Sequence, residues 1–262
     1  MNQGPVKEWF MKLTSVILLV TVLAIRSELA YSQIVNMESQ RYHTDTTGWK
    51  GSISGDFELT NYGQKVLDAN ANAHVQYQSL KGLYLLLGNY GFLRGGGQSF
   101  VDYGFLHFRY NYKAGRFIRL EAFTQLQQNA VTKIQSRFLI GTGPRLKLIS
   151  DKKLKLYLGL LTVYEIEKVS GIPASTRDWR FSDYLSMTYM PNEQMEFVTT
   201  TYYQPVIDAF KDYRLLNQCM FKIKAGKKLS VYLSWNYQFD ATPAPDVPRE
   251  TYSISTGIEL SL

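Results

Sequence analysis

From about residue 48 onward, apolar and polar residues alternate along the chain. An alternation with a period of two predicts a β-strand, because successive side chains of a strand point to opposite faces. In the clearest case one face would carry Leu229, Val231, Leu233, Trp235, Tyr237 and Phe239, and the other Ser230, Tyr232, Ser234, Asn236, Gln238 and Asp240. The pattern therefore predicts strands with one apolar and one polar face.

The alternation predicts about 12 strands, with lengths typical of strands that cross a membrane. They lie near 49–60, 66–79, 82–93, 99–112, 116–127, 133–149, 154–167, 179–190, 195–203, 213–224, 229–239 and 250–262. So much strand is unusual for a soluble domain. A closed barrel has no edges, however, and lipid can cover its outer face. We therefore expect an all-β fold, an antiparallel transmembrane β-barrel over residues 48–262.

The connections between the expected strands alternate in length. Every second one is a tight turn, at 80–81, 113–115, 150–153, 191–193 and 225–228. The others are generally longer, as at 94–98, 169–178, 204–212 and 241–249. In an outer-membrane barrel with both termini in the periplasm, this order predicts short periplasmic turns and longer extracellular loops. A soluble β-sandwich has no reason to sort its loops in this way.

The N-terminus carries the pattern of an export signal. An apolar run over 13–25 precedes the small residues Ala30 and Ser32, which suit positions −3 and −1 of a cleavage site. We expect a cleaved signal peptide over 1–32 and a periplasmic segment over 33–47. An N-terminal membrane anchor is the alternative, but the apolar run is short for a membrane-spanning helix.

The overall composition fits a barrel although its mean hydropathy is only −0.20. A barrel exposes only alternate residues to lipid, so its average is mixed. The chain has 19 Tyr and 14 Phe, and a single Cys rules out an internal disulfide and a Cys-based zinc or iron–sulfur site. Aromatic residues near strand ends predict a girdle at the membrane surface, or else the core of a soluble barrel: Tyr62, Tyr77, Tyr110, Tyr112, Trp179, Tyr203, Trp235 and Tyr252.

Charged residues are expected on the polar face, which would line the lumen. This set consists of Lys50, Asp56, Glu58, His74, His107, Arg109, Arg119, Glu121, Arg137, Arg145, Lys147, Asp183, Arg214 and Glu259. Both signs of charge are present, which leaves two interpretations open: a polar pore or binding cavity, or a salt-bridge network that plugs a narrow lumen. The diameter of a barrel of about 12 strands does not decide between them.

No motif in the chain points to catalysis or to a bound cofactor. The sequence lacks a Gly-x-Ser-x-Gly elbow, a His-Glu-x-x-His helix and an Asp-rich calcium loop. His43 precedes the expected barrel, and a structural hydrogen bond is the commoner role for lumen residues such as His74 and His107. We expect no catalytic, cofactor-binding or metal-binding residues. Nucleic acid is not an expected partner either, because the net charge of +7 is spread evenly and the chain carries an export signal.

Several stretches resemble a family of salt-induced outer-membrane proteins of Gram-negative bacteria. They are 34–41 (IVNMESQR), 48–51 (GWKG), 107–110 (HFRY), 121–148, 212–214 (DYR) and 237–248 (YQFDATPAPDVP). The resemblance implies an outer-membrane barrel and supplies no substrate or catalytic residues. The chain departs from barrels in general at Leu262, where an aromatic residue is common in the signal for barrel assembly.

These observations favour an integral outer-membrane barrel without enzymatic activity, either a narrow channel or a structural or envelope-stress component. Its expected partners are outer-membrane lipid and lipopolysaccharide, the barrel-assembly machinery and a small solute. Two alternatives belong to other classes: a barrel-borne lipid-modifying enzyme and a soluble secreted β-protein that binds a ligand.

Overall fold

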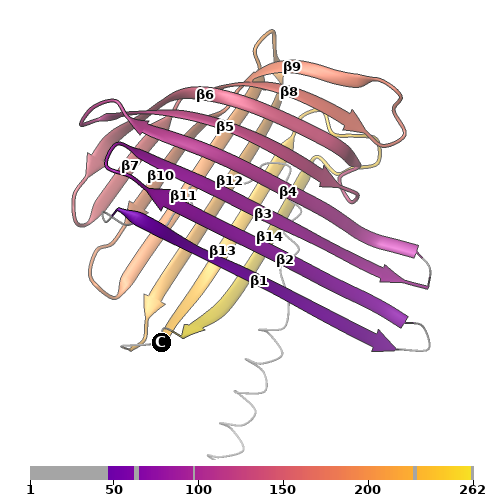
Figure 1. The fold of residues 1–262 in the computed structure, drawn as a ribbon, viewed down its shortest axis with the longest axis horizontal. Coiled ribbons are helices and arrows are strands. Elements are labelled where there is room, and N and C mark those ends of the chain that lie inside the picture. The colour runs from indigo at the N-terminus through magenta and orange to yellow at the C-terminus, as the bar shows by residue number, and fades with distance from the viewer. Residues whose placement is uncertain (1–46, 62–64, 97, 227–228, 261–262) are drawn as a thin grey trace, which may run out of the picture.

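The computed structural model describes residues 47–61, 65–96, 98–226 and 229–260, which form one antiparallel sheet of fourteen strands (Figure 1). The strands are β1 (Gly48–Asn61), β2 (Lys65–Gln78), β3 (Gly82–Gly95), β4 (Gln98–Lys113), β5 (Ile118–Asn129), β6 (Ile134–Ser150), β7 (Leu154–Gly159), β8 (Thr162–Val169), β9 (Ser175–Phe181), β10 (Asp183–Tyr189), β11 (Met195–Val206), β12 (Ala209–Lys224), β13 (Leu229–Asp240) and β14 (Glu250–Leu260). None of these residues forms a helix long and apolar enough to cross a membrane. The expected signal peptide, most of the expected periplasmic segment, Tyr62 and Leu262 lie outside the described residues.

The all-β antiparallel fold is confirmed, and the difference in strand number has a local cause. Two of the expected strands are each interrupted once, so that 154–167 becomes β7 and β8, and 179–190 becomes β9 and β10. β6 pairs with both β7 and β8, and the path round the sheet still has twelve positions. The break faces Pro144, which has no N–H to donate and whose carbonyl accepts a hydrogen bond from the Leu160 N–H at 2.9 Å.

The strands extend beyond the apolar alternation at one end of the sheet. The connection expected at 204–212 contracts to 207–208, whereas 170–174 and 241–249 stay loops. Backbone pairing needs no apolar side chains, so the ladder continues where the alternation stops. We call this end the loop end, and the end with the β2–β3, β4–β5, β6–β7, β10–β11 and β12–β13 connections the turn end.

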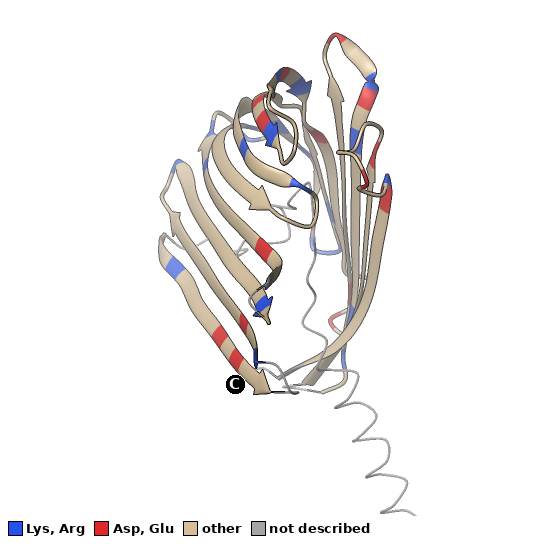
Figure 2. Cartoon of the chain, turned by 90° about the vertical axis from the view of Figure 1, so that its right-hand side faces the viewer, with Lys and Arg blue, Asp and Glu red and all other residues tan. Residues whose placement is uncertain are grey.

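The sheet curls until its first strands lie in front of its last ones (Figure 1). In Figure 2 two walls face each other, and long uncharged stretches of strand separate the charged positions. The expected closed ladder is not complete in the described residues, because the strand order begins at β1 and ends at β14 with no ladder between them. β1 and β14 are therefore the edges of the sheet in this structure.

The outer face of the sheet is apolar, as the alternation predicts. Large exposed hydrophobic side chains occupy it on successive strands, among them Ile53, Leu86, Leu106, Leu120, Ile140, Leu185, Leu233 and Ile254. Aromatic rings form rows at both ends. At the turn end Trp49, Tyr77, Tyr84 and Tyr110 follow one another across β1 to β4 with centroid distances of 4.8, 6.1 and 4.7 Å. At the loop end Tyr164 and Trp179 lie 5.0 Å apart, and Tyr203 and Tyr213 5.6 Å.

Candidate functional site

The inner face divides into two parts that differ in burial. Of the expected lumen residues, the structure buries His107, Arg109, Glu121, Arg137, Arg145 and Arg214. Lys50, Asp56 and Glu58 are exposed on β1, and His74, Arg119 and Lys147 are half-buried. Glu259 takes an inward position opposite Ser230, but its side chain is outside the described part of the structure.

Asp183 is the one expected lumen residue that the structure places on the outer face. It pairs with Tyr203 and lies two residues before Leu185, both of which face outward and are exposed. We expected it to point inward because a charge in hydrocarbon is costly. The alternation within β10 decides instead, since Tyr184 points inward. The Asp183 carboxylate lies near the backbone of Leu161, at the break in the neighbouring strand.

Five strands, β6, β8, β9, β12 and β13, bring a cluster of buried ion pairs together near the loop end. We call it the loop-end cluster, and its central residue is Arg214 on β12. Its Nη1 lies 2.9 Å from Glu165 Oε2, its Nη2 3.0 Å from Glu167 Oε2, and its Nε 3.1 Å from Asp240 Oδ2. One guanidinium therefore joins carboxylates from β8 and β13.

Two further arginines complete this cluster. Arg137 on β6 pairs with Glu167 and lies 3.7 Å from Glu165. Arg180 on β9 lies 3.2 Å from Glu165 and 3.1 Å from Asp212. Charge-assisted pairs of this kind offset the cost of burying ions only when each ion keeps its partners. Arginines and carboxylates are nearly equal in number here. This part of the lumen therefore carries a network of ion pairs and no large excess of positive or negative charge.

A second cluster, the turn-end cluster, lies closer to the short turns. Its centre is Glu121 on β5, which is 1% exposed. Arg109 Nη1 lies 3.3 Å from Glu121 Oε2, and Arg145 Nε lies 3.8 Å from Glu121 Oε1. The Tyr184 hydroxyl donates to the same carboxylate at 2.9 Å. Arg145 also lies over the ring of Tyr157, 3.8 Å from its centroid, which is a cation–π contact.

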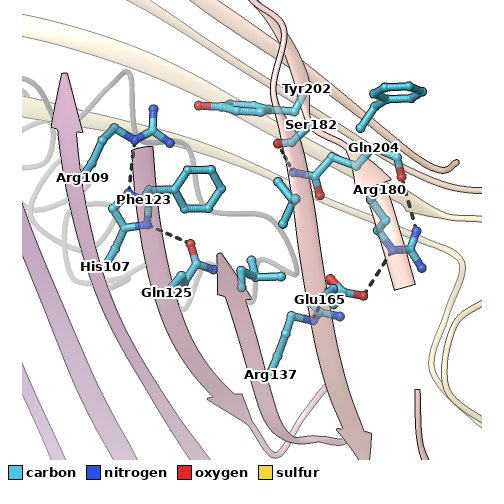
Figure 3. A pocket seen from close by; sticks show the side chains of 13 residues that line it. His107, Arg109, Phe123, Gln125, Arg137, Glu165, Arg180, Ser182, Tyr202 and Gln204 are labelled. Atoms are coloured by element: carbon cyan, nitrogen blue, oxygen red, sulfur yellow. Dashed lines mark hydrogen bonds and ion pairs between the residues drawn. The ribbon is translucent and has the colours of Figure 1, made fainter. Parts of the chain in front are cut away.

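Neutral polar groups extend from Arg109 of the turn-end cluster into the space between the two clusters (Figure 3). Arg109 Nε donates to His107 Nε2 at 3.3 Å, so this nitrogen is the acceptor and Nδ1 carries the proton. His107 Nδ1 then donates to Gln125 Oε1 at 3.0 Å. His107 and Gln125 lie on one side of a cavity of about 30 Å³, with Gln204 on the other. A space of this volume is large enough for one or two water molecules.

Bulky side chains fill the rest of this region. Phe123, Leu161, Val163, Tyr184, Tyr202 and Leu216 form a buried cluster inside the curled sheet. Glycines make room for the rings: a Cβ on Gly159 would lie 2.1 Å from the ring of Tyr184, and one on Gly141 2.6 Å from that of Phe123. The two ionic clusters, apart from Asp240 of β13, and these side chains lie on β4 to β12. We call this region the packed half.

The inner faces of β1, β2, β13 and β14 form the open half, with Asn89 of β3 at its border. Their central side chains are uncharged, polar, and exposed or half-exposed. Asn89 Nδ2 donates to Asn72 and, at 3.2 Å, to Asn70. The hydroxyls of Ser234 and Ser255 lie 2.5 Å apart. Sequence reasoning missed this division, because both halves show the same alternation. The signal that distinguishes them is the type of polar residue, Arg and Glu in one half and Ser and Asn in the other.

Among the described residues, no three His, Cys, Asp or Glu side chains are grouped so that they would hold a metal ion. The fold places the protein in the class of all-β proteins whose curled antiparallel sheet surrounds a polar interior. The particular family follows from sequence comparison. A family described as "Protein of unknown function, DUF481" matches residues 52–261, and the chain belongs to it.

Comparisons with individual proteins add distant likenesses. No curated protein matches the chain. One similar solved structure is titled "NanC porin structure in rhombohedral crystal form", with 9% identity and a TM-score of 0.48, covering 80% of this chain and 99% of that one. Another is titled "Bacterial polysaccharide outer membrane secretin", with 6% identity and a TM-score of 0.44, covering 79% and 88%. At these scores neither likeness bears on function.

Proposed function

We propose that the protein is an outer-membrane β-barrel that passes small, uncharged hydrophilic solutes along its open half. One observation carries this proposal: the central inward side chains of β1, β2, β13 and β14 are polar, uncharged and accessible, while the packed half is filled. The apolar outer face and the aromatic rows at both ends support a membrane location, because such rings favour the headgroup level.

The chemistry of the open half favours neutral solutes. Amide and hydroxyl groups replace the hydrogen bonds that a solute hydroxyl loses when it leaves water. Charge in the open half is confined to positions toward its ends: Asp56, Glu58 and Asp68 toward the loop end, and Lys50 together with Glu259 at the turn end. The acidic residues toward the loop end repel anions. Uncharged polyols and sugars do not meet this barrier.

A membrane channel also needs its edges joined. Each unsatisfied backbone group costs several kcal/mol in hydrocarbon, so we infer that β1 pairs with β14 in the bilayer. The alternation requires inward residues to face inward residues. If Lys50 lies opposite Glu259, then Ser54 lies opposite Ser255, and the outward Gly51 and Gly55 lie opposite Ile258 and Ile254 in turn. This register matches charge with opposite charge and small residues with large ones.

The experiment that tests solute passage is swelling of proteoliposomes in neutral sugars of increasing size. The folded protein should permit swelling in the smallest sugars. Ser234→Trp puts a large ring on the inner face of the open half and should reduce swelling severalfold. Leu233→Trp, its neighbour on the exposed outer face, is the matched control and should swell like the wild type. Folded wild-type protein that permits no swelling would overturn the proposal.

The packed half supports a second candidate, a structural barrel that conducts nothing. Its ionic clusters fill the lumen of that half much as a plug would, and the same swelling measurement separates the two candidates. A structural part in the response of the envelope to stress, which the sequence leaves open, stays a prediction. The contacts of His107 with Arg109 and Gln125 are of a structural kind and give no support to a lipid-modifying enzyme.

A further inference from the structure

Charged side chains on the β8–β9 hairpin are sorted by face. Directly paired residues share a face, and the pairs are Tyr164 with Trp179, Ile166 with Arg177, and Lys168 with Ser175. Trp179 is 56% exposed, so these pairs belong to the outer face. The carboxylates of the hairpin take the alternate positions, and Glu165 and Glu167 are buried in the loop-end cluster. The outer face of the hairpin therefore carries positive charge only.

The outward residues form a column that runs toward the loop end. Tyr164 and Trp179 are at its base, with ring centroids 5.0 Å apart. Arg177 is one outward position nearer the loop end and Lys168 the next, which makes them diagonal neighbours about 7 Å apart across the two strands. We call these four residues the hairpin patch.

The hairpin patch is accessible on its β9 side. β11 pairs with β9 only through Val206 and Arg180, so β9 continues toward the loop end with no described strand beside it there. Arg177 is exposed and Lys168 is half-exposed. The nearest turn on that side, at 207–208, contributes Asp208, and the outward Lys211 follows it on β12.

We propose that the hairpin patch binds the phosphorylated headgroup of an anionic glycolipid in the outer leaflet. Arg177 and Lys168 contact the phosphate, since a guanidinium presents paired donors that match phosphate oxygens and an ammonium adds a point charge. Tyr164 and Trp179 lie below, at the level where aromatic rings meet the boundary between headgroups and acyl chains. This inference rests on the proposed membrane location, which puts the loop end in the outer leaflet.

The position of the hairpin patch favours a lipid over a soluble phosphate. It lies on the outer face, continuous with the apolar surface of Ile166 and the aromatic pair, and not on the inner face where a passing solute would contact it. A lipid headgroup would be held at this surface in two ways: its phosphate contacts the cations, and its acyl chains contact the apolar outer face. A free phosphate finds only two partly exposed cations, whose attraction water and salt screen.

Native mass spectrometry of the full chain, released from nanodiscs, tests the proposal. Nanodiscs of phosphatidylcholine alone are compared with nanodiscs that also contain bisphosphorylated lipid A. The wild type should retain lipid A selectively, and Arg177→Gln with Lys168→Gln should lower the retention about tenfold. The matched control is Lys113→Gln with Arg116→Gln, which removes two exposed cations at the turn end and should retain lipid A like the wild type.

Three outcomes would overturn the proposal: equal retention by the patch variant and the wild type, equal loss in the control, and full competition by inorganic phosphate at the concentration of the lipid. Heat-modifiable gel migration confirms that each variant is folded. As a second measurement, the fluorescence of Trp179 in a Trp9→Phe, Trp49→Phe, Trp235→Phe background should be quenched by lipids with brominated chains. Lipid retention does not depend on solute passage, so failure of the channel proposal leaves this result readable.

Discussion

The packed half and the open half are built by the same alternation, yet only one of them is filled. In the packed half the inward residues are long or bulky, such as Arg214, Glu165 and Tyr184, and they reach across the lumen to one another. In the open half they are short, such as Ser54 and Ser255, and stay accessible to water. Strand periodicity therefore sets which side a residue faces, whereas the length and charge of the side chains decide whether that side of the sheet is filled.

Replacing Arg214, at the centre of the loop-end cluster, should lower the stability of the protein more than any other change considered below. Arg214→Met leaves the carboxylates of Glu165, Glu167 and Asp240 buried with fewer cations, which should destabilise the protein by about 3–5 kcal/mol. Denaturant unfolding in micelles measures this. Arg116→Met, in an exposed turn, should change the free energy of unfolding by less than about 0.5 kcal/mol. An Arg214→Met protein as stable as the wild type would show that the loop-end cluster adds no stability.

Disulfide crosslinking tests whether β1 and β14, the edges that border the open half, pair with each other, and its expected effect on stability is somewhat smaller. In a Cys219→Ala background, Ser54→Cys with Ser255→Cys should form an intramolecular disulfide under mild oxidation and stabilise the barrel by about 2–4 kcal/mol. Non-reducing gels detect the crosslink. Ser52→Cys with Ser255→Cys and Asp56→Cys with Ser255→Cys shift the register by two residues in either direction and should crosslink poorly. Crosslinks that join two chains would mean that the edges of different molecules pair instead.

A smaller effect concerns the fit of rings against glycines in the packed half. Gly159→Ala puts a methyl group into the ring of Tyr184 and should cost about 1–3 kcal/mol. Combining it with Tyr184→Leu removes the clash, so the two changes together should cost less than their sum. Simple additivity in this double-mutant cycle would argue against a contact between ring and methyl.

The smallest effect on stability is expected from an exposed ion pair at the loop end. Lys133 Nζ lies 2.8 Å from Asp246 Oδ2 and joins two loop-end connections. The hydrogen bond and positive charge of Lys133 hold the pKa of Asp246 below its ordinary value. A lowered folded-state pKa means that the pair stabilises the fold above the unfolded-state pKa and loses this effect as the pH falls below about 4. Asp246→Asn should slightly flatten the fall in thermal stability over this range, and an unchanged pH profile would refute the pairing.

Much of the fold was predictable because it follows from periodicity. The alternation near Leu233 and Trp235 predicted which residues face outward, and burial agrees. The break beside Leu160 was not predictable in the same way, since an interruption of one or two residues leaves the alternation almost intact. The outward position of Asp183 was not predictable from its charge, because the alternation around Tyr184 determines it.

The sequence predicted several of the charged residues in the lumen, but not which of them form ion pairs with one another. Arg137, Glu121 and Arg214 were expected in the lumen, and they are there. Glu165 and Arg180, which complete the loop-end cluster, were not singled out. Which arginine meets which carboxylate depends on how the curled sheet brings distant strands together, and no local pattern contains that information.

The loop-end cluster also bears on the order in which the chain folds. Arg137 and Glu167 are 30 residues apart, whereas Arg214 is 49 residues from Glu165. Contacts between more distant residues form later, because more chain entropy is lost in making them. Until β12 arrives, Glu165 and Glu167 carry their charge without Arg214, and water must stay in the lumen to solvate them. Pairing of β12 is therefore the step at which water leaves the loop-end cluster. A chain that stops folding before this step keeps a hydrated lumen around Glu165 and Glu167.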